Sequence, residues 1–180
     1  MVKNKLRIFK AGRMFVLCLG VVFLSVGFLV TYLLGLPLIE QAKASKNWPT
    51  TEGVVLNSKV VTHRSSNSSS STYSAKVIYR YQVEGQNHEG KTVWFGSDLS
   101  TSNRSLAEET VGKYPNDKKV TVYYDPQDPA AAVLEPGVFK STYFYYLFGW
   151  LFMGPGILMT GIPLFRSLFR SLFRKFRREA

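Results

Sequence analysis

Two long stretches without a charged side chain most constrain what this chain can fold into. They are residues 14–39 (MFVLCLGVVFLSVGFLVTYLLGLPLI) and residues 141–165 (STYFYYLFGWLFMGPGILMTGIPLF). Each exceeds the roughly 20 apolar residues that cross the hydrocarbon core of a bilayer. A helix of a soluble core seldom stays apolar on every face over that length. We therefore predict transmembrane helices at residues 14–39 and 141–165, with one small domain, residues 40–140, between them.

Positive charge gathers in the two tails outside these stretches. Residues 1–13 contain five basic residues and no acid, and residues 166–180 contain six basic residues and one acid. Residues 41–139 are nearly balanced, with eleven basic and ten acidic residues. Short segments rich in Lys and Arg stay on the cytoplasmic side of a membrane. We therefore expect a protein of the cell (inner, cytoplasmic) membrane with both termini in the cytoplasm and residues 40–140 outside.

The C-terminal tail combines basic and apolar residues at helical spacing. Arg166, Arg170 and Arg174 lie four residues apart and would form one stripe of a helix, beside a stripe of phenylalanines. Such a helix suits the lipid headgroup layer, where each basic side chain contributes on the order of 1 kcal/mol. The residues expected to face lipid are Arg166, Arg170, Arg174, Lys175, Arg177 and Arg178. A cytoplasmic protein partner is a weaker alternative, and nucleic acid is not expected, because the balanced middle segment does not extend the basic patch.

A cleaved signal peptide is the competing interpretation of the N-terminus. The tripeptide Ala42-Lys43-Ala44 has the form of a processing site. The apolar run before it is, however, about twice as long as the hydrophobic region of a signal peptide. We therefore expect the first helix to be retained.

The middle segment has the sequence pattern of a small β domain. Residues 75–84 (AKVIYRYQVE) alternate apolar and polar side chains, which is typical of a half-buried strand. Further strands are predicted at residues 51–62, 88–95, 119–124 and 131–135. A short helix is predicted before the fourth strand. Ser105 and Glu108 form a capping box for it, and Gly112 is suited to end it in the left-handed conformation.

This order of elements predicts a fold class. Five strands with a helix between the third and the fourth is the topology of a small Greek-key barrel such as the OB-fold. We therefore expect two transmembrane helices flanking a five-stranded OB-like barrel with one short helix. An open β-sandwich is the alternative.

Several short motifs resemble a known family. They are residues 48–55 (WPTTEGVV), 77–81 (VIYRY) with Gly85, 113–115 (KYP), 120–126 (VTVYYDP) and 132–137 (AVLEPG). Together they resemble the bacterial membrane family known as domain of unknown function 3592, over about residues 48–137 and both flanking helices. The long Ser-rich stretch at residues 64–74 and the basic tail depart from that pattern. The resemblance implies this architecture and a bacterial envelope location, and it implies no activity.

The residues that carry catalysis or bind metals are sparse. The only histidines are His63 and His88, and the single cysteine, Cys18, lies in the first apolar run, so a zinc site lacks ligands. Neither a nucleophile elbow nor a phosphate-binding Gly-rich loop is present. The repeated Asp125-Pro126 and Asp128-Pro129 dipeptides are predicted to be turns. We therefore expect no enzyme activity, no cofactor and no metal.

Small residues recur at helical spacing in both apolar stretches. Gly27, Thr31 and Gly35 share one face of the first helix, and Gly156 and Thr160 share one face of the second. Small residues let transmembrane helices approach closely. The two faces are expected to pair, within one chain or between two chains, and the first arrangement is favoured. Pro163 is expected to end the second helix.

We expect the domain to act by binding. The leading hypothesis is a non-enzymatic interaction or scaffold protein that binds a protein partner, or another copy of itself, at the membrane surface. The predicted contact residues are the aromatic side chains Tyr73, Trp94 and Phe95. The alternative is an envelope enzyme or ligand sensor with a polar site near His88 and Asp98, where the domain meets the membrane.

The predicted topology can be tested with reporter fusions. A reporter fused after Ala180 is expected to be active only in the cytoplasm, since the basic tails hold both termini there. The same reporter inserted beside Ser69 is expected to be active only outside. Reversed activities at the two positions would overturn the predicted orientation.

Overall fold

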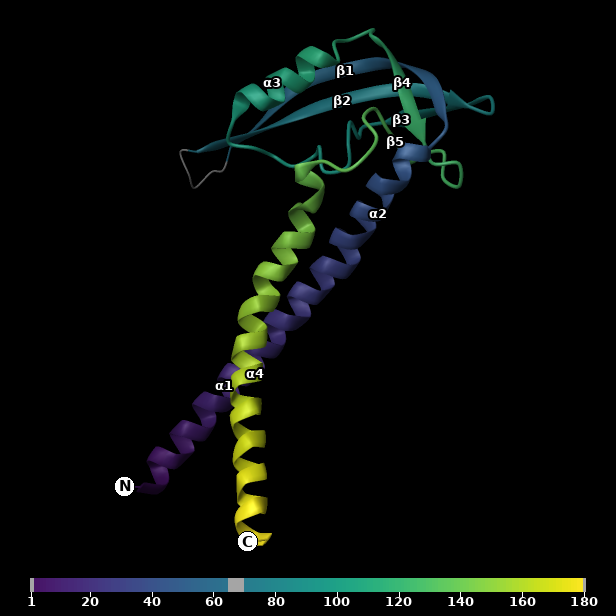
Figure 1. Cartoon of the computed structure of the whole chain (residues 1–180). Helices are drawn as coiled ribbons and strands as arrows, with labels where there is room; N and C mark the ends of the chain where they lie inside the picture. Colours follow the sequence, from purple (N-terminus) through teal and green to yellow (C-terminus); the bar gives the residue numbers. More distant parts are fainter. Residues whose placement is uncertain (1, 65–69, 180) are drawn as a thin grey trace. The chain divides into compact units, whose positions relative to one another are not determined.

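The computed structural model describes residues 2–64 and 70–179, and Figure 1 shows its elements. In the two terminal helices, the side chains of residues 2–11, 13, 167–168 and 170–179 lie outside this description. The structure divides into two units. One consists of residues 1–36 and 145–180 and is helical, and the other is the β-rich segment of residues 37–144.

Both apolar stretches are helical, as predicted. α1 (Val2–Leu29) continues without interruption through the π-helical segment η1 (Val30–Gly35) into α2 (Leu36–Ala44), and the 3-10 turn η2 (Ser45–Asn47) follows. The short turn η3 (Lys140–Tyr143) leads into α4 (Phe144–Glu179). Two helical regions, Met14–Asn47 and Lys140–Arg166, are long and apolar enough to span a membrane.

The expectation that Pro163 ends the second helix is wrong. α4 continues through Pro155 and Pro163 as far as Glu179. Proline removes one backbone hydrogen bond, but its fixed φ is compatible with a helix, so a long helix can pass through it. The predicted basic tail therefore belongs to the same helix as the apolar stretch.

Small residues lie where the two long helices of the helical unit touch. Gly27 faces Gly149 and Met153, and a Cβ atom on Gly149 would overlap the side chain of Thr31. Further contacts join Gly35 to Tyr146, and Gly20 to Gly156 and Thr160. The small residues named from the sequence thus lie on faces that meet within one chain.

The five strands form one open antiparallel sheet. They are β1 (Thr50–Arg64), β2 (Ser71–Val83), β3 (Gln86–Gly90), β4 (Lys119–Tyr124) and β5 (Ala132–Val133). Their order in the sheet is β3-β2-β1-β4-β5, so β3 and β5 are at opposite edges. The OB-like barrel is therefore wrong, because a barrel requires its edge strands to pair with each other. The open sandwich is also not what the described residues form, since all five strands belong to a single sheet.

The predicted alternation of β2 is confirmed, and it builds the core. Val77, Tyr79, Tyr81 and Val83 are buried on one face, against Val55, Val122 and Leu134. The Tyr79 hydroxyl donates to the carbonyl oxygens of Thr92 and Ala132, both at 2.9 Å. Its ring passes over Gly90, the residue opposite it on β3. Tyr79 thereby ties β2 to the irregular segment that follows β3 and to the edge strand β5.

Several local predictions differ from the structure. The predicted strand at residues 88–95 ends at Gly90, and α3 (Arg104–Lys113) is capped by Asn103 instead of Ser105. The Asn103 side chain accepts from the Ser105 amide at 3.1 Å, while Glu108 pairs with Arg104. Gly112 lies inside the helix and does not end it. Arg104 extends the helix backwards, and this moves the cap two residues upstream.

The proline turns behave as predicted. The carboxylate of Asp125 accepts from the amide of Gln127 at 2.9 Å, and that of Asp128 accepts from the amide of Ala130 at 3.2 Å. These two contacts reach the backbone two residues ahead, as expected for Asp in turns. The turn then places Ala132 and Val133 beside β4.

Two glycines test this description of the core and of α3. Gly90→Ala should destabilise the protein by about 1–3 kcal/mol, because the new methyl group would overlap the buried Tyr79 ring. Gly112→Ala should stabilise it by up to about 1 kcal/mol, since the position is helical with open space beside it. Thermal unfolding of the purified full chain measures both. A lower melting temperature for Gly112→Ala would mean that Gly112 ends the helix after all.

Candidate functional site

One recess of the β domain is a cleft of about 390 Å³ whose lining surface is mainly apolar. Its walls come from the start of β2, the segment of residues 94–101, α3, and the segment of residues 135–141. Most of the lining is apolar or aromatic, and hydroxyl groups lie around it. The residues that define this aromatic cleft are Tyr73, Ala75, Trp94, Leu99, Leu106 and Phe139, with Ser97, Thr101, Thr110 and Ser141 among the hydroxyl-bearing residues.

One wall of the aromatic cleft is an irregular segment joined to the edge of β2. Tyr73 and Thr101 exchange both backbone hydrogen bonds, at 2.7 and 2.8 Å. The guanidinium group of Arg104 lies over the Tyr73 ring, 5.8 Å from its centroid. Tyr73 is therefore held by its backbone on one side and by a cation on the other, and it remains half-buried.

The second aromatic side chain, Trp94, is held by residues of the segment that precedes α4. Its indole Nε1 donates to the Ser141 hydroxyl at 3.0 Å, and its ring lies 5.6 Å from that of Phe139. Trp94 is half-buried. Phe95, the third predicted contact residue, is only 8 % exposed and packs with Ala42 and Val133 in a second core cluster. Phe95 is therefore a core residue, and we withdraw it as a contact residue.

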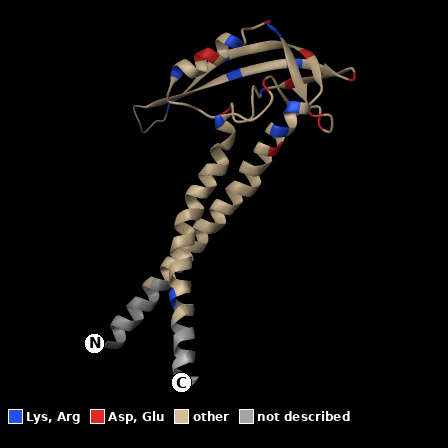
Figure 2. Ribbon diagram, viewed as in Figure 1, with Lys and Arg blue, Asp and Glu red and all other residues tan. Residues whose placement is uncertain are grey.

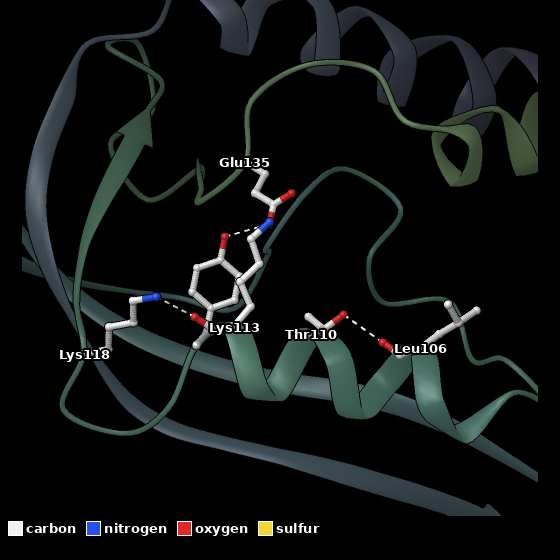
Figure 3. A network of polar contacts seen from close by, with 6 residues as sticks. Leu106, Thr110, Lys113, Lys118 and Glu135 are labelled. Atoms are coloured by element: carbon white, nitrogen blue, oxygen red, sulfur yellow. Dashed lines mark hydrogen bonds and ion pairs between the residues drawn. The ribbon is translucent and has the colours of Figure 1, made fainter.

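Two residues that line the aromatic cleft, Lys113 and Glu135, belong to a network of polar contacts, which Figure 3 shows. Lys113 and Glu135 form an ion pair at 2.6 Å, and the Tyr114 hydroxyl donates to the same Glu135 oxygen at 2.7 Å. Lys118 donates to the Lys113 carbonyl oxygen at 2.7 Å and so closes the end of α3. Burial raises the pKa of Tyr114, and the hydrogen bond to Glu135 and the charge of that carboxylate raise it further. The phenol therefore stays protonated and remains a donor.

This arrangement suits binding better than catalysis. The carboxylate of Glu135 already accepts from a cation and a phenol, so it is poorly placed to act as a general base. The rest of the lining offers hydroxyl groups, apolar side chains and one further acidic residue, Glu109. A concave apolar surface with a few polar groups is typical of a ligand or peptide pocket, and the volume falls in the usual range.

The two histidines of the chain are not brought together. His63 lies at the far end of β1, 3.0 Å from the Ser74 hydroxyl. His88 stacks on Tyr81, with ring centroids 5.5 Å apart. His63 lies opposite Thr72 of β2, and His88 lies opposite Tyr81 of the same strand. Because the stretch of β2 from Thr72 to Tyr81 is roughly 30 Å long, the two histidines are far apart. Within the described residues, no three His, Cys, Asp or Glu side chains group to hold a metal.

The predicted lipid-facing residues lie on the last part of α4. Arg166 is exposed, and it is the one basic residue of this set whose side chain is described. Figure 2 marks the positions of Lys and Arg in blue and of Asp and Glu in red along the described chain. The other five positions, Arg170, Arg174, Lys175, Arg177 and Arg178, lie outside the described side chains. The helical backbone does continue through them.

Sequence reasoning missed most of the aromatic cleft. Leu106 lies off the predicted apolar face of α3, yet it lines the cleft and is 51 % exposed. Phe139, Ser141 and Glu135 come from the segment before α4, which has no periodic pattern. The one signal in the sequence was a leucine in the first turn of the predicted helix that lies off its apolar face.

The comparison with protein families gives one match. The family described as domain of unknown function (DUF3592) matches residues 51–139. This range covers α3, all of the sheet except Thr50, and all of the aromatic cleft except Ser141. No curated protein matches the chain.

The buried phenols give the domain an alkaline limit. Burial, as the main cause, raises the pKa of Tyr79, Tyr81 and Tyr114 above their ordinary value of about 10. Below pH 10 both the folded and the unfolded chain keep these protons, so the contribution to stability is complete. Above pH 10 the unfolded chain loses them first, and stability should fall as pH rises. Denaturation midpoints from pH 8 to pH 11.5 measure this, and Tyr114→Phe should make the decline less steep. An unchanged slope would show that Tyr114 does not contribute.

Proposed function

Because residues 51–139 of this chain are a DUF3592 domain, we propose that the protein is a membrane-anchored binding module without catalytic activity. In this proposal α1–α2 and α4 cross a bacterial cell membrane, and both termini are cytoplasmic. The β domain lies outside and receives an apolar side chain of a partner protein in the aromatic cleft.

The observation that carries the proposal is the position of Tyr73 and Trp94. Both were predicted contact residues, they are separated by twenty-one positions, and both line the same cleft. Each is held in place by a defined partner, Arg104 for Tyr73 and Ser141 for Trp94. Rigid aromatic side chains around a recess are typical of the centre of a protein interface. Their fixed positions reduce the conformational entropy lost on binding.

The membrane placement rests on the helices and on the charges beside them. The two helical regions are long and apolar enough to span a membrane, and large apolar side chains such as Phe15, Leu33 and Leu151 are exposed along them. Lipid would cover these side chains. Tyr143 and Trp150, near the start of α4, suit the interface region on the outer side.

Chain connectivity supports a position of the aromatic cleft close to that interface. Ser141 lines the cleft and precedes the first residue of α4, Phe144, by three positions. Three residues span at most about 10 Å. A partner that reaches the cleft would therefore bind near the membrane surface, and other membrane proteins are well placed to do so.

A charged side chain in the aromatic cleft tests the proposal. Leu106→Glu should reduce the amount of partner that co-purifies with the tagged full-length protein at least tenfold, because an unpaired carboxylate would be buried on binding. Leu106 is half exposed, so the substitution should leave the fold intact. Quantitative mass spectrometry after gentle detergent extraction from the native cells measures the partner.

Ser105→Glu is the matched control. It adds the same charge one residue away on α3, and Ser105 does not line the aromatic cleft. The control variant should retain the partner. Equal recovery with both variants, or a wild-type protein that purifies without any stoichiometric partner, would contradict the proposal.

A further inference from the structure

The half of the β1–β2 hairpin nearest its turn extends beyond the rest of the sheet. β4 pairs with β1 only over residues 50–54, and β3 pairs with β2 only over residues 79–83. Residues 57–64 and 71–78 therefore have each other as their main strand partners. One face of this half contributes Tyr73 and Ala75 to the aromatic cleft, beside α3. The other face points away from the core.

The residues of that outer face can be identified from the register of β1 and β2 and from the alternation of side chains along each strand. Lys59 lies opposite Lys76, Val61 opposite Ser74, and Asn57 opposite Ile78. Side chains opposite each other in a sheet share a face, so these six residues form one surface, here called the basic hairpin face. Both lysines are exposed, and Val61 and Ile78 are half-buried.

The charges of this face are not balanced. Residues 57–64 and 71–78 contain Lys59, Arg64 and Lys76 and no acidic residue. Like charges directly opposite each other in an antiparallel pair are destabilising. Within the described part of the chain, neither lysine of the pair takes part in an ion pair. Arg80, next along the same face, does have an acidic neighbour, Glu89, at 3.2 Å.

Charge and apolar surface together define what would complement this face. A phosphate polymer or a lipid headgroup would use the two lysines alone. An acidic polypeptide would also cover Val61 and Ile78. We propose that the basic hairpin face docks an extended acidic segment of a partner protein, whose carboxylates pair with Lys59 and Lys76 and whose apolar side chains lie on Ile78. Lys59, Lys76 and Ile78 do not line the aromatic cleft, so the two proposals can fail independently.

The test uses the purified full chain in nanodiscs of neutral lipid. The probe is a fluorescent peptide of three Glu-Ser-Val-Ser repeats, which presents Glu and Val on one face when extended. Two comparison probes are a peptide of three Glu-Ser-Ser-Ser repeats and long-chain polyphosphate. Fluorescence anisotropy should show that the Val-containing peptide binds at least threefold more tightly than the Ser-only peptide.

Charge reversal then locates the binding. The double variant Lys59→Glu with Lys76→Glu should weaken binding of the Val-containing peptide at least tenfold. The double variant Lys43→Glu with Lys140→Glu makes the same change in net charge on exposed residues elsewhere, and should change binding less than twofold. Leu106→Glu, which blocks the aromatic cleft, should leave peptide binding unchanged.

Three results would overturn the proposal. Equal weakening by both double variants would mean that only the net charge matters. Polyphosphate binding that is as tight as peptide binding, and equally dependent on Lys59 and Lys76, would identify a general anion site. Absence of binding to either peptide, with a wild-type melting temperature, would show that the face is not a docking surface.

Discussion

Two buried hydroxyl groups hold together the places where the chain enters and leaves the β domain. The Ser45 hydroxyl donates to the Ala42 carbonyl oxygen at 2.8 Å and accepts from the Gly137 amide at 2.9 Å. The Thr142 hydroxyl donates to the Phe95 carbonyl oxygen at 2.7 Å and accepts from the Phe139 amide at 3.0 Å. Both residues are fully buried. Loss of either hydroxyl would leave buried backbone groups unpaired, at about 1–3 kcal/mol. The wall of the aromatic cleft formed by residues 135–141 depends on these bonds.

In the helical unit, the contact depends on a close approach of two helix backbones. Gly27 and Gly149 meet where a side chain on either would collide with the opposite helix, and Thr31 is buried beside them. The π-helical segment Val30–Gly35 begins at this contact. A π turn shifts the register of a helix by about one residue, and it thereby changes which residues face the neighbouring helix. Glycine spacing and the local helix type thus act together to let α1–η1 and α4 lie against each other.

The β1–β2 hairpin gives the domain two unlike surfaces. Side chains alternate along each strand, so Tyr73 and Ala75 line the aromatic cleft while Lys76 does not. α3 packs against both strands, as Figure 1 shows. A single pair of long strands can therefore present an apolar recess and a charged surface to different parts of a partner, because the period of two separates them without any further element.

The sequence by itself determined the features that depend on composition and local pattern. These are the two long apolar helices, the alternation of β2, the Asp-Pro turns and the membership of the middle segment in its family. The tertiary structure decided the rest. β3 and β5 are too short and too far apart to close a barrel, and only the strand order shows this. The cap at Asn103 and the interior position of Gly112 depend on where α3 packs. The aromatic cleft joins Tyr73, Leu106, Glu135 and Ser141, which are distant in the chain, and no local pattern links them. Contacts of this kind are set by the packing of the whole domain, so they become visible only when the chain is folded.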